Sequence, residues 1–203
     1  MKYETIREPW TYERNPTYGA AQDWALACLG PATGIRRVLI VGSPPAEVVA
    51  FQRAGWDVTW VDCRRPPVLP GVESVHGDAC DLPVTWTDRF EAVSTTCVWC
   101  HVGMGRYGDQ VRPNACQTFL AELRRVCRGT LAAMVGPVAR TEEERMEHRI
   151  STPKGVETLL RQTGWRVQAM RVWSELERNW VEEVEIMPRA MEPPAEYLVV
   201  SAK

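Results

Sequence analysis

Short apolar runs and helical patterns alternate along most of the chain. Val38–Val41 is a continuous apolar run followed by Gly42, which is typical of a strand buried on both faces. Ala46–Ala54 has helical spacing, and Asp57–Val61 is rich in residues that favour strands. Because Asp62 follows directly, this stretch predicts a strand, a helix and a second strand that ends at an acid.

The alternation continues to the carboxyl end of the chain. Strands that alternate with helices favour a mostly parallel, doubly wound sheet with helices on both faces, so the sequence predicts an α/β fold. The further elements expected are strands around Val75 and at Phe90–Val98, Thr130–Val135, Gly164–Met170 and Glu196–Ser201, and helices at Ala115–Val126 and Pro153–Gln162.

The length of 203 residues fits one domain. We expect residues 1–34 to form an arm and a helix at Ala20–Leu29 that pack on a domain made by residues 35–203. A long connection from Ser174 to Ala195 precedes the last strand, and together with Glu196 it holds seven acids against two arginines. This connection is expected to be a solvated insertion that does not approach a phosphate backbone.

Composition excludes several classes of protein. Hydrophobic residues make up 45% and charged residues 25% of the chain, as in globular proteins, so wholesale disorder is excluded. The formal charge of −2 gives no general attraction to nucleic acid or acidic lipid. The sequence holds neither an apolar run of about 20 residues nor an export signal, so we expect a cytoplasmic protein without a membrane span. Seven cysteines, an odd number, are expected to be reduced thiols.

Three short features favour a ligand that contains a nucleoside. Gly42 follows the first strand of the doubly wound pattern, where a helix amino terminus meets the strand ends. Asp62 stands twenty residues later, at a spacing that suits an acid accepting hydrogen bonds from both ribose hydroxyls. After the third strand, Asp78 and Ala79 could contact an adenine ring. A purely structural alternative is that Gly42 makes a turn and Asp62 caps a loop.

Together these features resemble class I S-adenosylmethionine-dependent methyltransferases over residues 35–203. The resemblance implies a Rossmann-like three-layer sandwich whose last strand is antiparallel, and S-adenosylmethionine as the cofactor. The cofactor-binding residues that it implies are Gly42, Ser43, Glu47, Asp62, Cys63, Asp78 and Ala79.

The first turn departs from that family. The family usually has an acid two residues before the first glycine and a run of three glycines, whereas this chain has Ile40 and then Gly42-Ser43-Pro44-Pro45. The prolines lack N–H donors, so we expect an altered contact with the methionine end of the cofactor. A second hypothesis is therefore a binding or regulatory module that has lost productive cofactor contacts. A third, a nicotinamide-dependent enzyme, is disfavoured because no Gly-x-Gly-x-x-Gly follows Val41.

A glycine-rich loop after the fourth strand is the more specific motif. The loop His101-Val102-Gly103-Met104-Gly105-Arg106-Tyr107-Gly108-Asp109 resembles one found in a subfamily of methyltransferase-like domains, which also has an acid at the position of Glu47. It gives four catalytic candidates: His101 as general base, Asp109 to orient or neutralise it, Arg106 for an anionic substrate group and Tyr107 to stack or donate. The alternative is a structural loop whose polar side chains bind backbone.

The methyl acceptor is not fixed by the motif. A small molecule or a sugar-containing substrate is expected, and nucleic acid is disfavoured by the acidic connection. Trp10 and Tyr12, in an irregular arm over residues 1–18, could fold over the cofactor as a lid.

Cys97 and Cys100 precede His101 in a CxxCH pattern, but the chain lacks the context for haem attachment and a second ligand pair for zinc. We expect these thiols to fill space and predict no metal site.

Overall fold

The structure is a computed structural model. It describes residues 16–32, 34, 36–138, 143–145, 148–174, 178–181 and 196–203. Trp10, Tyr12 and most of the acidic connection lie outside these residues, and so does most of the predicted arm. No helix in the described ranges is long and apolar enough to cross a membrane.

Helices and strands alternate in the order that the apolar pattern predicts. The helices are α1 (Pro16–Leu29), α2 (Pro45–Arg53), α3 (Ala115–Val126) and α4 (Pro153–Gln162), with a short 3-10 helix η1 (Val84–Trp86). The strands are β1 (Arg37–Val41), β2 (Asp57–Asp62), β3 (Val72–His76), β4 (Phe90–Thr96), β5 (Cys127–Pro137), β6 (Glu143–Arg145), β7 (His148–Ile150), β8 (Val167–Ser174), β9 (Asn179–Val181) and β10 (Glu196–Ala202).

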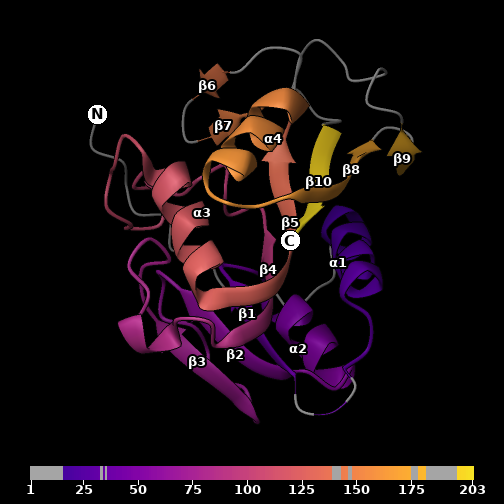
Figure 1. Cartoon of the computed structure of the whole chain (residues 1–203), viewed down its shortest axis with the longest axis vertical. Helices are drawn as coiled ribbons and strands as arrows, with labels where there is room; N and C mark the ends of the chain where they lie inside the picture. Colours follow the sequence, from indigo (N-terminus) through magenta and orange to yellow (C-terminus); the bar gives the residue numbers. More distant parts are fainter. Residues whose placement is uncertain are drawn as a thin grey trace.

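Eight strands form one sheet in the order β3-β2-β1-β4-β5-β10-β8-β9. Strands β1 to β5 are parallel, and β10 runs antiparallel to both of its neighbours, β5 and β8 (Figure 1). This topology confirms the predicted α/β class and the antiparallel last strand. The strand order reverses between β1 and β4, which is where ligands bind in sheets of this kind.

Strand β1 shows how the sequence builds three layers. Side chains alternate across a strand, so Val38 and Ile40 enter the core under α1 and α2, whereas Leu39 and Val41 enter the core under α3 and α4. All four are buried. The continuous apolar run is therefore explained by burial on both faces (Figure 1).

Several element boundaries differ from the predictions. Helix α1 begins at Pro16, so Tyr18 lies in a helix and not in an irregular arm. Strand β4 ends at Thr96 and not at Val98, because Cys97 adopts a φ of 56°, in the left-handed region. Strand β8 covers Val167–Ser174, later than the predicted Gly164–Met170.

Three short strands were not predicted. Strands β6 and β7 form a separate two-stranded sheet. Strand β9 lies inside the connection expected to be an insertion, and it pairs with β8 to form the edge of the main sheet. Each spans only three residues, too few to establish an alternating apolar pattern.

Candidate functional site

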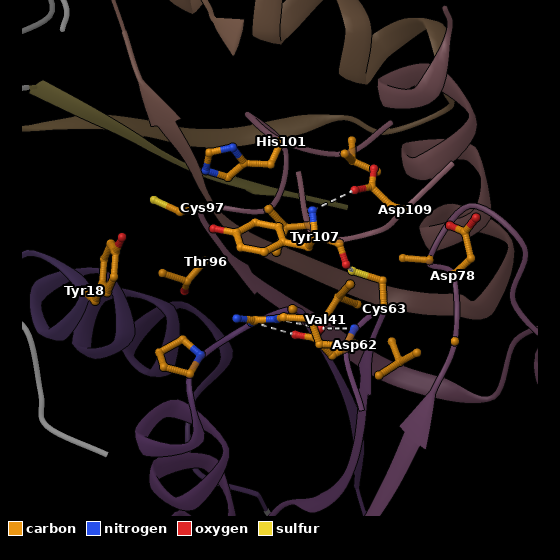
Figure 2. A pocket seen from close by; sticks show the side chains of 18 residues that line it. Tyr18, Val41, Asp62, Cys63, Asp78, Thr96, Cys97, His101, Tyr107 and Asp109 are labelled. Atoms are coloured by element: carbon orange, nitrogen blue, oxygen red, sulfur yellow. Dashed lines mark hydrogen bonds and ion pairs between the residues drawn. The ribbon is translucent and has the colours of Figure 1, made fainter. Parts of the chain in front are cut away.

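A cavity of about 190 Å³ lies at the carboxyl ends of β1, β2, β3 and β4, and we call it the strand-end cavity. Figure 2 shows side chains from three distant segments around it: Tyr18 from α1, Asp78 after β3 and His101 after β4. Most of the predicted site residues line it together. They are Gly42, Asp62, Cys63, Asp78, Ala79, His101, Tyr107 and Asp109.

Gly42 makes the turn at the end of β1. Its φ is 62°, and its N–H donates to the Val61 carbonyl over 2.9 Å. A Cβ at this position would lie 2.4 Å from Cγ2 of Val98, so only glycine fits without a shift of its neighbours. Helix α2 then begins at Pro45, and Pro44 at its N-cap makes no side-chain hydrogen bond. The turn is thus sterically tight, and two of its residues offer no N–H.

Asp62 ends β2 with its carboxylate held by Arg64. Oδ1 accepts the Arg64 backbone N–H at 2.7 Å and Arg64 Nε at 3.1 Å, and Oδ2 accepts a terminal nitrogen of the same guanidinium at 3.1 Å. The Asp62 side chain is only 2% exposed, whereas that of Arg64 is 24% exposed. Burial alone would lower the pKa of Arg64, but the hydrogen bonds and charge of Asp62 raise it above its ordinary value.

Asp78 organises the turn after β3. Its Oδ1 accepts the Cys80 backbone N–H at 2.8 Å, and its Oδ2 forms an ion pair with Arg112 at 3.0 Å. Each carboxylate oxygen has two lone pairs, so each can accept one further hydrogen bond from a ligand. Ala79, which also lines the cavity, follows directly in this fixed turn.

Asp109 holds the glycine-rich loop from inside. Its carboxylate accepts the backbone N–H groups of Gly103 at 2.7 Å, Gly105 at 3.4 Å and Tyr107 at 3.3 Å. Gly103 has a φ of 71°, and a Cβ there would lie 2.0 Å from Cβ of Ala115. The loop can therefore pack against the start of α3 only because residue 103 is glycine.

The folded loop presents two rings to the strand-end cavity. The rings of His101 and Tyr107 meet edge to face, with centroids 5.5 Å apart and planes at 86° (Figure 2). The guanidinium carbon of Arg64 lies 4.8 Å from the Tyr107 ring centroid, and that of Arg106 lies 5.3 Å from it. Arg106 does not line the cavity. Arg106 therefore packs against Tyr107 and does not lie in the cavity, where it was expected to contact an anionic group of the substrate.

Ser43 and Glu47 lie behind the cavity and do not line it. The Glu47 carboxylate, which is fully buried, accepts hydrogen bonds from Ser94 Oγ at 2.7 Å and from Thr96 Oγ1 at 2.6 Å. Burial raises the pKa of Glu47, and hydrogen bonds from Thr96, Ser94 and Ser43 only partly offset this. Ser43 Oγ donates to the Val41 carbonyl and accepts the Thr96 N–H. These two residues therefore fix the wall of the cavity.

Several lining residues were not among the predicted site residues. Tyr18, Arg64, Thr96 and Cys97 all line the strand-end cavity. Arg64 could have been found from the sequence, because it stands two residues after Asp62, the expected ribose acid. Tyr18 falls at the end of the segment 1–18 that was expected to be an irregular arm, and its distance in sequence from the sheet gave no sign that it would reach the cavity.

Charge in the cavity is mainly negative. The pKa of the Cys63 thiol is raised to about 12, chiefly by burial and also by the nearby charges of Asp62 and Asp109, against the opposing effect of Arg64. The thiolate form of Cys63 would add a negative charge beside these carboxylates and is therefore disfavoured. The same potential would favour a cationic ligand.

The cysteines near the loop form internal contacts. Cys100 Sγ lies 3.3 Å from the Cys97 carbonyl oxygen. The pKa of the Cys100 thiol is raised, mainly by a hydrogen bond with the Cys97 side chain and also by burial. No disulfide joins any two of the seven cysteines, all of which the structure describes. Within the described ranges, no three histidine, cysteine or acidic residues are grouped so that they could hold a metal ion.

Comparison with known proteins places the fold. No family model matches the sequence, and no curated protein matches it. The structure of 1,6-didemethyltoxoflavin-N1-methyltransferase from Burkholderia thailandensis, with its substrate and S-adenosylhomocysteine bound, is similar with a TM-score of 0.64 and 20% identity. The similarity covers 90% of this chain and 76% of that one.

Two further solved structures have the same arrangement. Geranyl diphosphate C-methyltransferase from Streptomyces coelicolor A3(2) has a TM-score of 0.62 at 12% identity, over 92% of this chain and 79% of that one. The cyclase SpnF has a TM-score of 0.64 at 14% identity, over 91% and 80%. Identities this low establish the fold alone, and the inclusion of a cyclase agrees with that limit. The chain therefore has the Rossmann-like fold of S-adenosylmethionine-dependent methyltransferases.

Proposed function

We propose that this protein is a methyltransferase that uses S-adenosylmethionine and acts on a small-molecule or sugar-containing acceptor. The observation that carries the proposal is the strand-end cavity, which joins the expected ribose acid Asp62, the expected adenine segment Asp78–Ala79 and the ring of His101. It lies beside the reversal of strand order between β1 and β4, where a doubly wound sheet binds its ligands.

The residues of the cavity fit the adenosine end of the cofactor. The Asp62 carboxylate would accept the two ribose hydroxyls, and the second lone pair on an Asp78 oxygen would accept the adenine amino group. Gly42 lets the chain turn sharply at the end of β1, next to this site. Fixed turns at these three positions mean that the protein loses little conformational freedom when the ligand binds.

The negative potential around Cys63 fits the charged end of the cofactor. When bound, S-adenosylmethionine supplies a methyl group on a positively charged sulfur. The carboxylates that raise the pKa of Cys63 would stabilise that charge. Methyl transfer to a hydroxyl also requires that the acceptor lose a proton, and His101, whose ring lines the cavity, is the group we assign to take it.

The remaining loop residues would act by position. Asp109 binds three amide groups of the loop, so its role is to hold His101 and Tyr107 in place. Arg106 supports the Tyr107 ring from outside the cavity. Tyr107 then forms a wall of the acceptor site against which a planar or sugar ring can pack.

The second candidate is a module that binds a ligand without catalysis. The proline pair at the start of α2 favours it, because Pro45 removes a donor from the helix terminus that would face the cofactor. The two candidates differ in whether S-adenosylmethionine is consumed. Both allow adenosine to bind at Asp62.

The test is a parallel thermal-shift and turnover experiment. S-adenosylmethionine, S-adenosylhomocysteine and NAD are each added, and a ligand at a hundredfold its Kd should stabilise the protein by about 2.7 kcal/mol. We expect both S-adenosyl compounds, but not NAD, to stabilise it. Release of S-adenosylhomocysteine is then measured with pools of hydroxyl-bearing metabolites. No response to any ligand would contradict the proposal.

His101→Ala tests the role assigned to His101, and the turnover of the wild type separates the two candidates. The variant should bind S-adenosylhomocysteine like the wild type and lose about 10²–10⁴-fold in turnover, the usual contribution of a general base. His101→Gln, which keeps a polar side chain of similar length, serves as the control for packing and should lose as much turnover. Loss of binding in His101→Ala would make His101 structural, and binding without any turnover in the wild type would favour the module.

A further inference from the structure

The Asp62–Arg64 ion pair occupies hydrogen-bonding positions that the proposed ribose contact needs. We propose that Arg64 is a gate: its guanidinium occupies the face of Asp62 that a ribose diol needs, and it must leave before a nucleoside ligand can bind. This inference rests on the proposed function, because it concerns the ribose contact of that site. It adds a residue that controls affinity for the ligand.

The hydrogen-bond positions on Asp62 are nearly filled. Two carboxylate oxygens offer about four lone-pair positions. Oδ1 uses both of its positions for the Arg64 backbone N–H and Nε, and Oδ2 uses one for the terminal nitrogen of Arg64. One position remains. A diol that donates two hydrogen bonds needs two, so at least one guanidinium contact must break.

Access to Asp62 is limited to the cavity side. The Asp62 side chain is 2% exposed, and both Asp62 and Arg64 line the strand-end cavity. A ligand therefore approaches Asp62 from the side on which the guanidinium lies. The planar fork of arginine matches a carboxylate with two parallel bonds, which is the geometry a diol would also use.

Arg64 can leave Asp62 without losing all of its contacts. Its guanidinium carbon lies over the Tyr107 ring, 4.8 Å from the ring centroid, and this contact does not involve Asp62. The backbone N–H of Arg64 also stays on Oδ1 when the side chain moves. The open state thus keeps one hydrogen bond and the contact with Tyr107.

A gate of this kind weakens apparent affinity by a calculable factor. The apparent Kd equals the intrinsic Kd divided by the fraction of molecules in the open state. If the pair is closed about nine-tenths of the time, deletion of the Arg64 side chain should tighten binding about tenfold.

The experiment is a calorimetric titration of S-adenosylhomocysteine and of adenosine into the wild type, Arg64→Ala and Arg64→Lys. Adenosine is neutral, so its affinity is insensitive to the loss of a positive charge in the cavity. We expect about tenfold tighter binding of both ligands by Arg64→Ala. Arg64→Lys keeps the charge but not the fork, so it should fold like the wild type and bind with an intermediate Kd.

Arg161→Ala is the matched control. It removes an arginine that pairs with Glu157 on the surface of α4, far from the cavity in the fold, and its Kd should equal that of the wild type. Equal or weaker binding by both Arg64 variants overturns the gate while the proposed function stands. If neither the wild type nor the Arg64 variants bind either ligand, the proposed function itself fails, and the gate with it.

Discussion

Glu47 Oε2 accepts a hydrogen bond from Thr96 Oγ1 over 2.6 Å and thereby ties the first turn of α2 to the end of β4. Thr96 lines the strand-end cavity, and Glu47 lies directly behind it, fully buried. The second oxygen, Oε1, accepts from Ser94 Oγ on the same strand. A buried carboxyl group thus fixes the wall of the cavity without contacting its contents.

Glu47 should make stability depend on pH. Its folded-state pKa is raised above the ordinary 4.5, so its contribution to stability is fully present below that value and is lost as pH rises through the folded-state pKa. Glu47→Gln keeps the shape and abolishes the titration. The Tm of this variant should therefore rise relative to that of the wild type as the pH goes from 4 to 8. Each tenfold difference in proton affinity between the folded and unfolded states is worth about 1.4 kcal/mol of stability. Thermal unfolding across this range measures it, and a constant difference between the two proteins would be the contrary result.

Gly103→Ala should displace the glycine-rich loop. An added Cβ would meet Cβ of Ala115 at 2.0 Å, and φ of 71° strains any side chain by about 1–3 kcal/mol. Turnover should fall at least about tenfold. Gly105→Ala is the matched control because it has a similar φ of 79° but its Cβ would lie 3.0 Å from the Val111 side chain. Equal losses in the two variants would show that strain, and not the approach to α3, limits activity.

Asp109→Ala should loosen the same loop by a different route. Three backbone N–H groups lose their acceptor, and leaving a buried donor unsatisfied costs about 1–3 kcal/mol. We expect lower stability in chemical unfolding and faster proteolytic cleavage within residues 101–109. Asp57→Ala, at an exposed acid that begins β2, should leave both unchanged. Unaltered cleavage in Asp109→Ala would show that the loop is held by other contacts.

The sheet could be predicted because strands that are buried on both faces have continuous apolar runs in the sequence. Val38–Val41 and Asp57–Val61 are apolar or β-forming throughout, so their places in the sheet follow from composition and order. The positions of Gly42 and Asp62 at strand ends then follow from the fold class. The same reasoning brought Asp78 and His101 to one edge of the sheet.

The missed features depend on three-dimensional contacts that no short pattern records. Strand β4 stops early because Cys97 takes a left-handed φ, although cysteine has no preference that would reveal it. Tyr18 reaches the cavity only because α1, which lies far before β2 in the sequence, packs across the sheet. Ser43 and Glu47 were expected to contact the cofactor, yet hydroxyl groups of β4 draw the Glu47 carboxylate into the core.

The most direct measurement of the central claim is a calorimetric titration of S-adenosylhomocysteine into the wild type, Asp62→Ala and Asp81→Ala. Asp81 is an exposed acid on the same side of the fold, after β3, and its replacement should leave the Kd unchanged. The account predicts one site in the wild type and a loss of at least about tenfold in affinity for Asp62→Ala, because the ribose acceptor is gone. Binding of equal strength to Asp62→Ala, or no binding to the wild type, would contradict the account.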